Sequence, residues 1–130
     1  MSKIEKVEDL ISWQKSKDLT IEIYKITKSN AFAKDFGLCN QIQRAAVSIP
    51  SNIAEGFGRG GNKEFLQFLS IAKGSLYELK TQLIIAFEIG YLTDIEYAKL
   101  KKNDSDEIGR LITGFMNYLN QSELKGIKYK

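Results

Sequence analysis

Residues 38–64 constrain this chain most, because they carry two stripes of side chains at helical spacing. Apolar residues recur at steps of three and four, which is typical of one buried helix face: Leu38, Ile42, Ala45, Ala46, Ile49 and Ile53. A second stripe with the same period is wholly polar: Gln41, Arg44, Ser48, Asn52, Glu55 and Arg59. At about 100° per residue, the polar stripe lies beside the apolar one. A polar row at the edge of a core is placed to meet a neighbouring helix or another subunit.

The same spacing predicts four helices, over about residues 9–28, 38–58, 63–89 and 94–120. Trp13 is predicted to anchor the core from the first helix. Thr93 and Glu96 form a capping box, which indicates the start of the fourth helix. The connections are short, so neighbouring helices should be antiparallel. The sequence therefore predicts one all-α domain over residues 1–130, an antiparallel up-down-up-down four-helix bundle.

Two places in the predicted helices leave alternatives open. Pro50 lies inside the second helix, where it removes a backbone hydrogen bond to the Ala46 carbonyl. Both stripes continue through it, which favours one kinked helix over a break and a restart at Ser51. Neighbouring polar side chains could satisfy the freed backbone groups, namely Ser48, Ser51 and Asn52. Residues 99–107 are polar on nearly every face, so the fourth helix either bulges from the bundle or frays there.

The helix ends and the loops carry further expectations. Asp9 or Ser12 could cap the first helix, and Asn62 the third. Phe32 and Phe36, in the loop over residues 29–37, are expected to fold back onto the bundle. The glycines of GFGRGGNK, residues 56–63, fit helix C-caps. They fit a phosphate-binding loop poorly, because no GK[ST] follows and no strand precedes them.

Composition excludes several classes of chemistry. The 130 residues contain no His and a single Cys, Cys39. The commonest general base and metal ligand are therefore missing, and an internal disulfide is impossible. We expect no cofactor, no metal site and no catalytic residue, and we interpret Cys39 as a buried structural thiol. The net charge of +3 is only mildly basic.

The sequence also bears on where the protein resides. No apolar run approaches the roughly 18 residues of a membrane span, and the first ten residues lack the apolar region of a signal peptide. A lone cysteine is typical of a reducing compartment. We therefore expect a cytoplasmic protein with no membrane partner.

An antiparallel hairpin of the second and third helices would pair positions whose numbers sum to about 122. This predicts an ion pair between Arg44 and Glu78 and places Ser48 against Gly74 and Ser75, where small residues would let the backbones approach. We interpret the stripe as a structural polar network of Gln41, Arg44, Ser48, Asn52, Glu55, Ser75 and Glu78. A ligand or nucleic-acid site is the alternative. Arg59 and Lys63, at the open hairpin end, are with Arg44 the candidate nucleic-acid-binding residues.

Four segments carry a resemblance to a known family: ISWQKSKDLTIEIYKIT at 11–27, QRAAVSIPSNIAEGFGR at 43–59, FLQFLSIAKGSLYEL at 65–79 and FEIGYLT at 87–93. They resemble the family called four helix bundle protein. Its first members were described as products of reading frames inside intervening sequences of bacterial 23S ribosomal RNA genes. The resemblance covers about nine-tenths of the chain. The family usually has a second Arg where this chain has Gln43, and a Pro where it has Ala33.

The resemblance implies a function that composition does not show. Related accessory variability proteins of retroelements are similar to basic pentameric barrels that engage RNA and a reverse transcriptase. We therefore expect a non-catalytic homo-oligomer, a pentamer by this resemblance, that binds RNA, another nucleic acid or a ribonucleoprotein electrostatically. Tail lysines Lys125, Lys128 and Lys130 could contribute. The alternative is a purely structural oligomeric scaffold or a small-molecule-binding bundle.

The residues themselves support only the association. Several apolar side chains fall outside the predicted core stripes and would leave apolar surface on a monomer: Val47, Ala54, Phe57, Ile71 and Ile85.

Overall fold

The computed structural model describes residues 4–124, and the side chains of all of these except residues 30, 102–104 and 122–124. The long helices are α1 (Ile11–Ile26), α3 (Phe36–Arg59) and α4 (Asn62–Glu88). A fourth long segment joins α5 (Asp94–Lys99), a π-helical stretch η2 (Leu100–Ser105) and α6 (Asp106–Leu124). A 3-10 turn η1 (Val7–Asp9) precedes α1, and a short helix α2 (Asn30–Lys34) precedes α3. No strand occurs within residues 4–124, and the predicted all-α class is confirmed.

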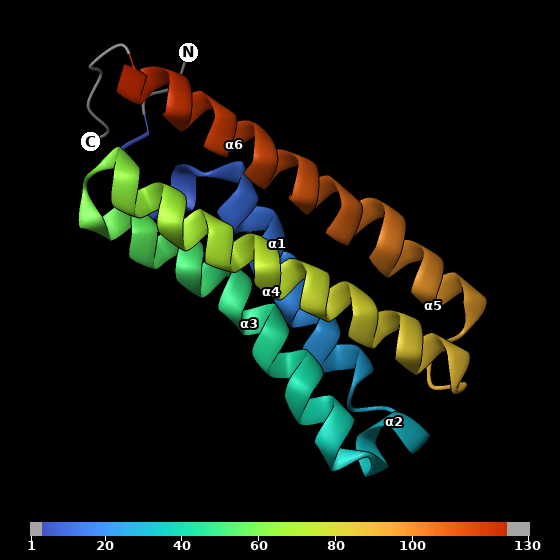
Figure 1. The fold of residues 1–130 in the computed structure, drawn as a ribbon. Coiled ribbons are helices and arrows are strands. Elements are labelled where there is room, and N and C mark those ends of the chain that lie inside the picture. The colour runs from blue at the N-terminus through green and yellow to red at the C-terminus, as the bar shows by residue number, and fades with distance from the viewer. Residues whose placement is uncertain (1–3, 125–130) are drawn as a thin grey trace.

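The four long segments pack side by side as an antiparallel bundle (Figure 1). α3 and α4 form a hairpin, α1 packs on α3, and α6 packs on α4 and closes onto α1. The start of α1, the turn between α3 and α4, and the end of α6 all lie at one end of the bundle (Figure 1). The four-helix bundle predicted from the sequence is therefore the observed architecture.

The apolar stripes form the core, as their spacing predicts. On α3 every member of the stripe except the half-buried Leu38 is buried. On α4 the buried face consists of Phe65, Leu69, Ala72, Leu76, Leu79, Leu83 and Ala86. Trp13 is half-buried and packs against this core from α1. Burial of these side chains is the main stabilising term in the fold.

Pro50 is accommodated inside one continuous helix, so the alternative of a break at Ser51 is wrong. Proline has no N–H to donate to the Ala46 carbonyl. The hydroxyl of Thr20, on α1, lies 3.0 Å from that carbonyl oxygen and 2.8 Å from the Ser16 carbonyl oxygen. Its single proton can bond one of the two at a time. The carbonyl freed by Pro50 is thus satisfied from a neighbouring helix, rather than only by residues beside the proline.

The helix ends follow the predicted turn chemistry in two places. Gly60 ends α3 with a left-handed backbone, φ 82°. Gly90 follows α4 with φ 91°, and the next N–H, of Tyr91, donates to the Ala86 carbonyl. Both are the conformations that glycine adopts at helix C-termini. The capping box of Thr93 and Glu96 is present in both directions.

Two predicted caps are wrong. The residue before α4 is Gly61, and Asn62 is instead buried in the first turn, where its Nδ2 donates to the Leu119 carbonyl 3.1 Å away. Leu10 precedes α1 and provides no side-chain cap. The Asp9 carboxylate accepts from the N–H groups of Glu5 and Lys6, so it caps the preceding 3-10 turn.

The connection before α3 contains the short helix α2, which the sequence did not predict. Phe32 lies in α2 and is buried, as expected, with its ring 5.2 Å from that of Tyr91. Phe36 is 81% exposed, so the expectation that it folds back is wrong. Asp35 caps α3 by accepting from the Leu38 N–H. The helix therefore starts at Phe36, before the apolar stripe begins.

The polar segment over residues 99–107 follows a continuous helical path. The stretch Leu100–Ser105 is π-helical, and the Ser105 hydroxyl lies 2.9 Å from the Leu100 carbonyl oxygen. Neither predicted alternative is observed, because the segment remains helical and Leu100 and Ser105 are buried against the bundle. A π-bulge adds a residue to one turn and shifts the side chains that follow, which sets the face that α6 presents to α4.

Candidate functional site

The middle of the polar stripe on α3 forms one hydrogen bond across the hairpin and two within α3. The hydroxyls of Ser48 and Ser75 lie 2.7 Å apart, where the antiparallel pairing placed them. The Asn52 amide donates to the Ser48 carbonyl and lies 2.9 Å from the Ser48 hydroxyl. All three residues are half-buried. These contacts fix the register of α3 against α4.

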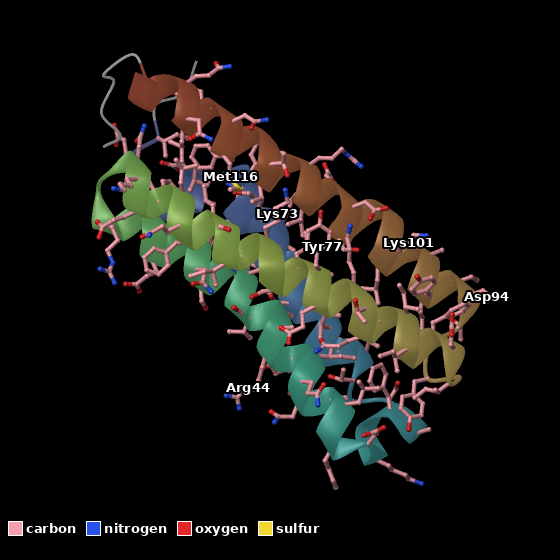
Figure 2. All side chains as sticks on the ribbon, viewed as in Figure 1. Arg44, Lys73, Tyr77, Asp94, Lys101 and Met116 are labelled. Atoms are coloured by element: carbon pink, nitrogen blue, oxygen red, sulfur yellow. The ribbon has the colours of Figure 1, made fainter. Side chains whose placement is uncertain are left out.

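The ends of the stripe behave differently. Arg44 and Glu78 are exposed, and among the described side chains neither forms an ion pair. Figure 2 shows Arg44 extending from α3 away from the bundle. The predicted ion pair between them is therefore wrong. Both charges instead lie on the outer face of the hairpin, as does the exposed Gln41.

Arg59 has a partner within its own helix. Its guanidinium bonds the Glu55 carboxylate at 3.0 Å and lies 5.1 Å from the centre of the Phe68 ring. Lys63 is exposed in the first turn of α4 and forms no ion pair among the described side chains.

The three predicted nucleic-acid-binding residues do not form one patch. Arg44 and Arg59 are separated by about 22 Å along α3, from the rise of 1.5 Å per residue. The tail residues Lys125, Lys128 and Lys130 lie outside the described residues.

A groove between α4 and α6 brings together a different set of charged side chains. Its volume is about 510 Å³, within the usual range for a ligand site. From α4 it is lined by Lys73, Tyr77 and Lys80, and from α6 by Asp106, Arg110, Thr113 and Asn117. Lys73 and Tyr77 lie on the side of α4 that faces α6 (Figure 2).

The groove is positively charged. Of its three cations only Lys80 meets a carboxylate, with its Nζ 3.0 Å from Asp106. Lys73 and Arg110 form no ion pair with any described side chain. Because paired charges cancel over short distances, the two unpaired cations determine the field in the groove.

Two glycines of α6, Gly109 and Gly114, line the groove without contributing a side chain to it. A Cβ on Gly109 would contact Leu76 of α4 at 3.4 Å, and a Cβ on Gly114 would meet nothing within 4 Å. A smaller cavity of about 60 Å³ continues past Lys80 and Asp106 toward η2, where Lys101 adds a further cation. The positive surface therefore extends along the seam between α4 and the last helical segment.

The sequence contains a signal for this groove. Lys73, Tyr77 and Lys80 stand at i, i+4 and i+7 on α4, and Arg110, Gly114 and Asn117 repeat that spacing on α6. Such rows lie on one helix face. That the two rows face each other depends on helix packing, which sequence spacing alone does not reveal.

Cys39 is held as a structural thiol. It is buried, and its Sγ lies 2.9 Å from the Phe32 carbonyl oxygen. Burial, with a smaller contribution from the nearby Asp35 carboxylate, raises the pKa of the Cys39 thiol. A reactive cysteine needs a lowered pKa and access, and Cys39 has neither. Within the described residues, no cluster of three or more acidic or thiol side chains is placed to hold a metal ion.

The fold and this groove define the class: an all-α helical-bundle protein with a cationic seam, in which no described helix is long and apolar enough to cross a membrane. Within that class, the chain belongs to the 23S rRNA-intervening sequence protein family, which matches residues 8–114. The resemblance inferred from the sequence is confirmed.

One solved structure supports both the fold and the family. It is the crystal structure of a protein with unknown function from the S23 ribosomal protein family of Bacteroides thetaiotaomicron. The two share 28% sequence identity with a TM-score of 0.74, over 82% of this chain and 98% of that chain. No curated protein matches this sequence.

Proposed function

We propose that this protein is a non-catalytic homo-oligomer that binds RNA or another nucleic acid electrostatically. The observation that carries the proposal is the groove between α4 and α6, where Lys73 and Arg110 face shared space and form no ion pair with a described side chain, while the Asp106 carboxylate pairs with Lys80. Cations that neutralise phosphates release bound counterions, and this release supplies most sequence-independent affinity. The family's description, which refers to intervening sequences in 23S rRNA, is consistent with a nucleic-acid partner.

Self-association would strengthen such binding. One chain carries a net charge of only +3, but a symmetric assembly repeats each groove around its axis. A modest charge per subunit then becomes a band of positive potential. Of the five apolar side chains that the sequence predicted to lie outside the core, Val47, Ile71 and Ile85 are exposed, as an interface would require. The other two are half-buried, and Phe57 packs against the core. The number five comes from the resemblance.

A non-catalytic role follows the chemistry of the available groups. The chain has no His, and its one thiol is buried with a raised pKa. The groove offers lysine, arginine, amide and hydroxyl groups, which bind phosphate and base edges. A structural scaffold is the competing function, and the hydrogen bonds of Ser48, Asn52 and Ser75 favour it for the polar stripe.

The test is a salt titration of binding to structured and unstructured RNA. We expect affinity to fall steeply with salt, and the variant Lys73→Gln/Arg110→Gln to lower both the affinity and the slope. Removing one phosphate contact to a single strand should reduce the slope by about 0.7. All RNA sequences should weaken alike, because phosphate contacts read no bases.

The matched control is Lys17→Gln/Lys25→Gln, which removes the same charge from paired lysines on α1 whose side chains are 44% and 71% exposed. It should leave the binding nearly unchanged. A third variant, Arg59→Ala/Lys63→Ala, tests the hairpin end separately. If the wild-type protein binds no RNA at low salt, where the electrostatic contribution is largest, the scaffold function is the better account.

A further inference from the structure

We infer that the groove between α4 and α6 binds an unpaired nucleotide, with its phosphate on Lys73 and Arg110 and its base against Tyr77. The inference rests on the proposed function and specifies its ligand as single-stranded. The juxtaposition that carries it is an exposed aromatic ring beside unpaired cations in one groove.

Tyr77 differs from most of the other aromatic side chains of the bundle. Three aromatic pairs stack or tilt against each other: Phe32 with Tyr91, Phe87 with Tyr97, and Phe115 with Tyr118. Tyr77 is 57% exposed and contacts no described aromatic ring. The Lys80 ammonium lies over its ring, 5.7 Å from the centroid. A cation over one face leaves the opposite face available for a base to stack on.

The register of the two helices places the cations around this ring. Lys73 is one turn before Tyr77 on α4, about 6 Å along the axis. Gly109 of α6 lies opposite Leu76 and α6 runs antiparallel to α4, so Arg110 lies near the level of Ser75, between Lys73 and Tyr77 along the axis. A phosphate held between Lys73 and Arg110 is therefore adjacent to a base on Tyr77. This combination of backbone cations and an aromatic platform is typical of single-strand binding.

On the Lys73 side of the proposed phosphate position, the groove also offers groups for the edge of a neighbouring base. Thr113 and Asn117 line it, and neither side chain makes a hydrogen bond within the part of the chain that the structure describes. The open space at Gly114 leaves room above them. In a duplex the base faces are covered by stacking and the pairing edges are occupied. An unpaired base exposes both its faces and its pairing edge to a protein.

A free nucleotide and a strand share this chemistry, so the experiment must separate them. Fluorescence anisotropy would compare a labelled single-stranded RNA, its blunt-ended duplex, and AMP as an unlabelled competitor. We expect the single strand to bind more tightly than the duplex. Weak competition by AMP assigns the ligand to a strand, in which neighbouring phosphates add contacts. Strong competition assigns it to free nucleotides.

Substitutions at Tyr77 test the contribution of its aromatic ring to binding. Tyr77→Leu should weaken single-strand binding about tenfold, the scale of one base–aromatic stack, and leave duplex binding unchanged. Tyr77→Phe, which retains the ring, should restore the wild-type affinity. Tyr24→Leu is the matched control, because Tyr24 is 39% exposed on α1, outside the groove. Circular dichroism and assembly mass would show that each variant folds and associates normally.

Different results would contradict the single-strand inference and the broader proposal of nucleic-acid binding. If the protein binds single strands and duplexes equally, and Tyr77→Leu changes neither, the inference is wrong while electrostatic nucleic-acid binding stands. If neither RNA binds at low salt and AMP does not bind either, both are wrong.

Discussion

Gly56 and Gly114 are both glycines inside long helices, yet their surroundings predict opposite effects of one substitution. A Cβ on Gly56 would lie 2.7 Å from Phe65 Cδ1 and 2.8 Å from Phe68 Cβ. Those distances are too short for carbon atoms, and Phe68 Cβ cannot move without its backbone. Gly56→Ala should therefore lower the free energy of unfolding by about 1–3 kcal/mol, as overpacking does. Urea denaturation would measure the change.

Gly114→Ala supplies the matched comparison. Nothing lies within 4 Å of a Cβ there, and alanine restricts the unfolded chain more than glycine. The substitution should raise the free energy of unfolding by about 0.5–1 kcal/mol. If both variants were equally stable, α3 and α4 would not pack as closely at Gly56 as the structure shows.

These glycines also show what a sequence can reveal about packing. The hairpin pairing predicted close approach at Gly74, but a Cβ on Gly74 meets nothing within 4 Å. The close approach occurs at Gly56, which the sequence assigned to the turn. Spacing identified which residues share a face of α3, but the distance between two helices depends on both partners together.

Thr20 and Pro50 connect two helices through one hydrogen bond. The Ala46 carbonyl lacks its usual helical donor because of Pro50, and the Thr20 hydroxyl is 3.0 Å away. Thr20→Val should destabilise the fold by about 1–2 kcal/mol by leaving that carbonyl unsatisfied. In a Pro50→Ala background a backbone N–H returns, so the same Thr20→Val change should cost less. A double-mutant cycle in urea measures the coupling, and simple additivity of the two changes would contradict this account.

The junction between α2 and α3 should be sensitive to alkaline pH. Tyr91 donates from its hydroxyl to the Asp35 carboxylate at 3.0 Å, and this bond, with burial second, raises the pKa of Tyr91. Burial raises the pKa of Cys39 nearby. Both groups are neutral in the fold and ionise more easily when unfolded. Their stabilisation is thus complete below the ordinary values of 9.0 and 10.0 and is lost as pH rises through the higher folded values.

Urea midpoints measured from pH 7 to pH 11 would test this. The wild-type midpoint should fall above about pH 9. Tyr91→Phe should be less stable at pH 7, because it lacks the bond to Asp35, but should lose less on going to high pH. An equal alkaline loss in both proteins would show that Tyr91 is not responsible.

At the level of helices, the predictions that succeeded were local. The four helices, the capping box at Thr93 and the helix-ending Gly60 each depend on a few neighbouring residues, and each appears as predicted. Gly56 and Gly58, from the same glycine-rich stretch, lie inside α3 instead. The short helix α2 and the exposed Phe36 were missed, because residues 29–37 contain no periodic stripe. Arg44 and Glu78 have the predicted register, yet both extend into solvent.

The candidate site needed information that no single segment contains. Lys73 and Arg110 are far apart in the sequence and meet only because α6 packs antiparallel on α4. The register of α6 follows in turn from the π-helical stretch Leu100–Ser105, which the sequence did not predict. A two-helix site of this kind becomes visible after the bundle is assembled.

On the surface of the whole molecule, exposed apolar side chains form a row along α4. Ile71, Glu78 and Ile85 recur every seven residues along α4, in the row that includes Ser75, whose hydroxyl contacts Ser48 of α3. This row therefore lies along the outer side of the hairpin, where Ile71 is 51% and Ile85 46% exposed. Exposed branched side chains in a row, with the unpaired charges of Arg44 and Glu78 beside them, are suited to contact a second copy of the chain.

Light scattering of the wild-type protein at micromolar concentration should therefore give a mass several times the 14.7 kDa of one chain, and five times by the family resemblance. Ile71→Glu should shift the assembly toward the monomer, because each contact would bury an unpaired carboxylate. Ile95→Glu is the control: Ile95 is more exposed, at 81%, but lies at the start of α5, away from the hairpin face. It should leave the mass unchanged. A monomeric wild type, or equal dissociation by both variants, would show that the hairpin face is not the interface. Each subunit would then have to bind RNA through its own groove, without the combined positive potential of an assembly.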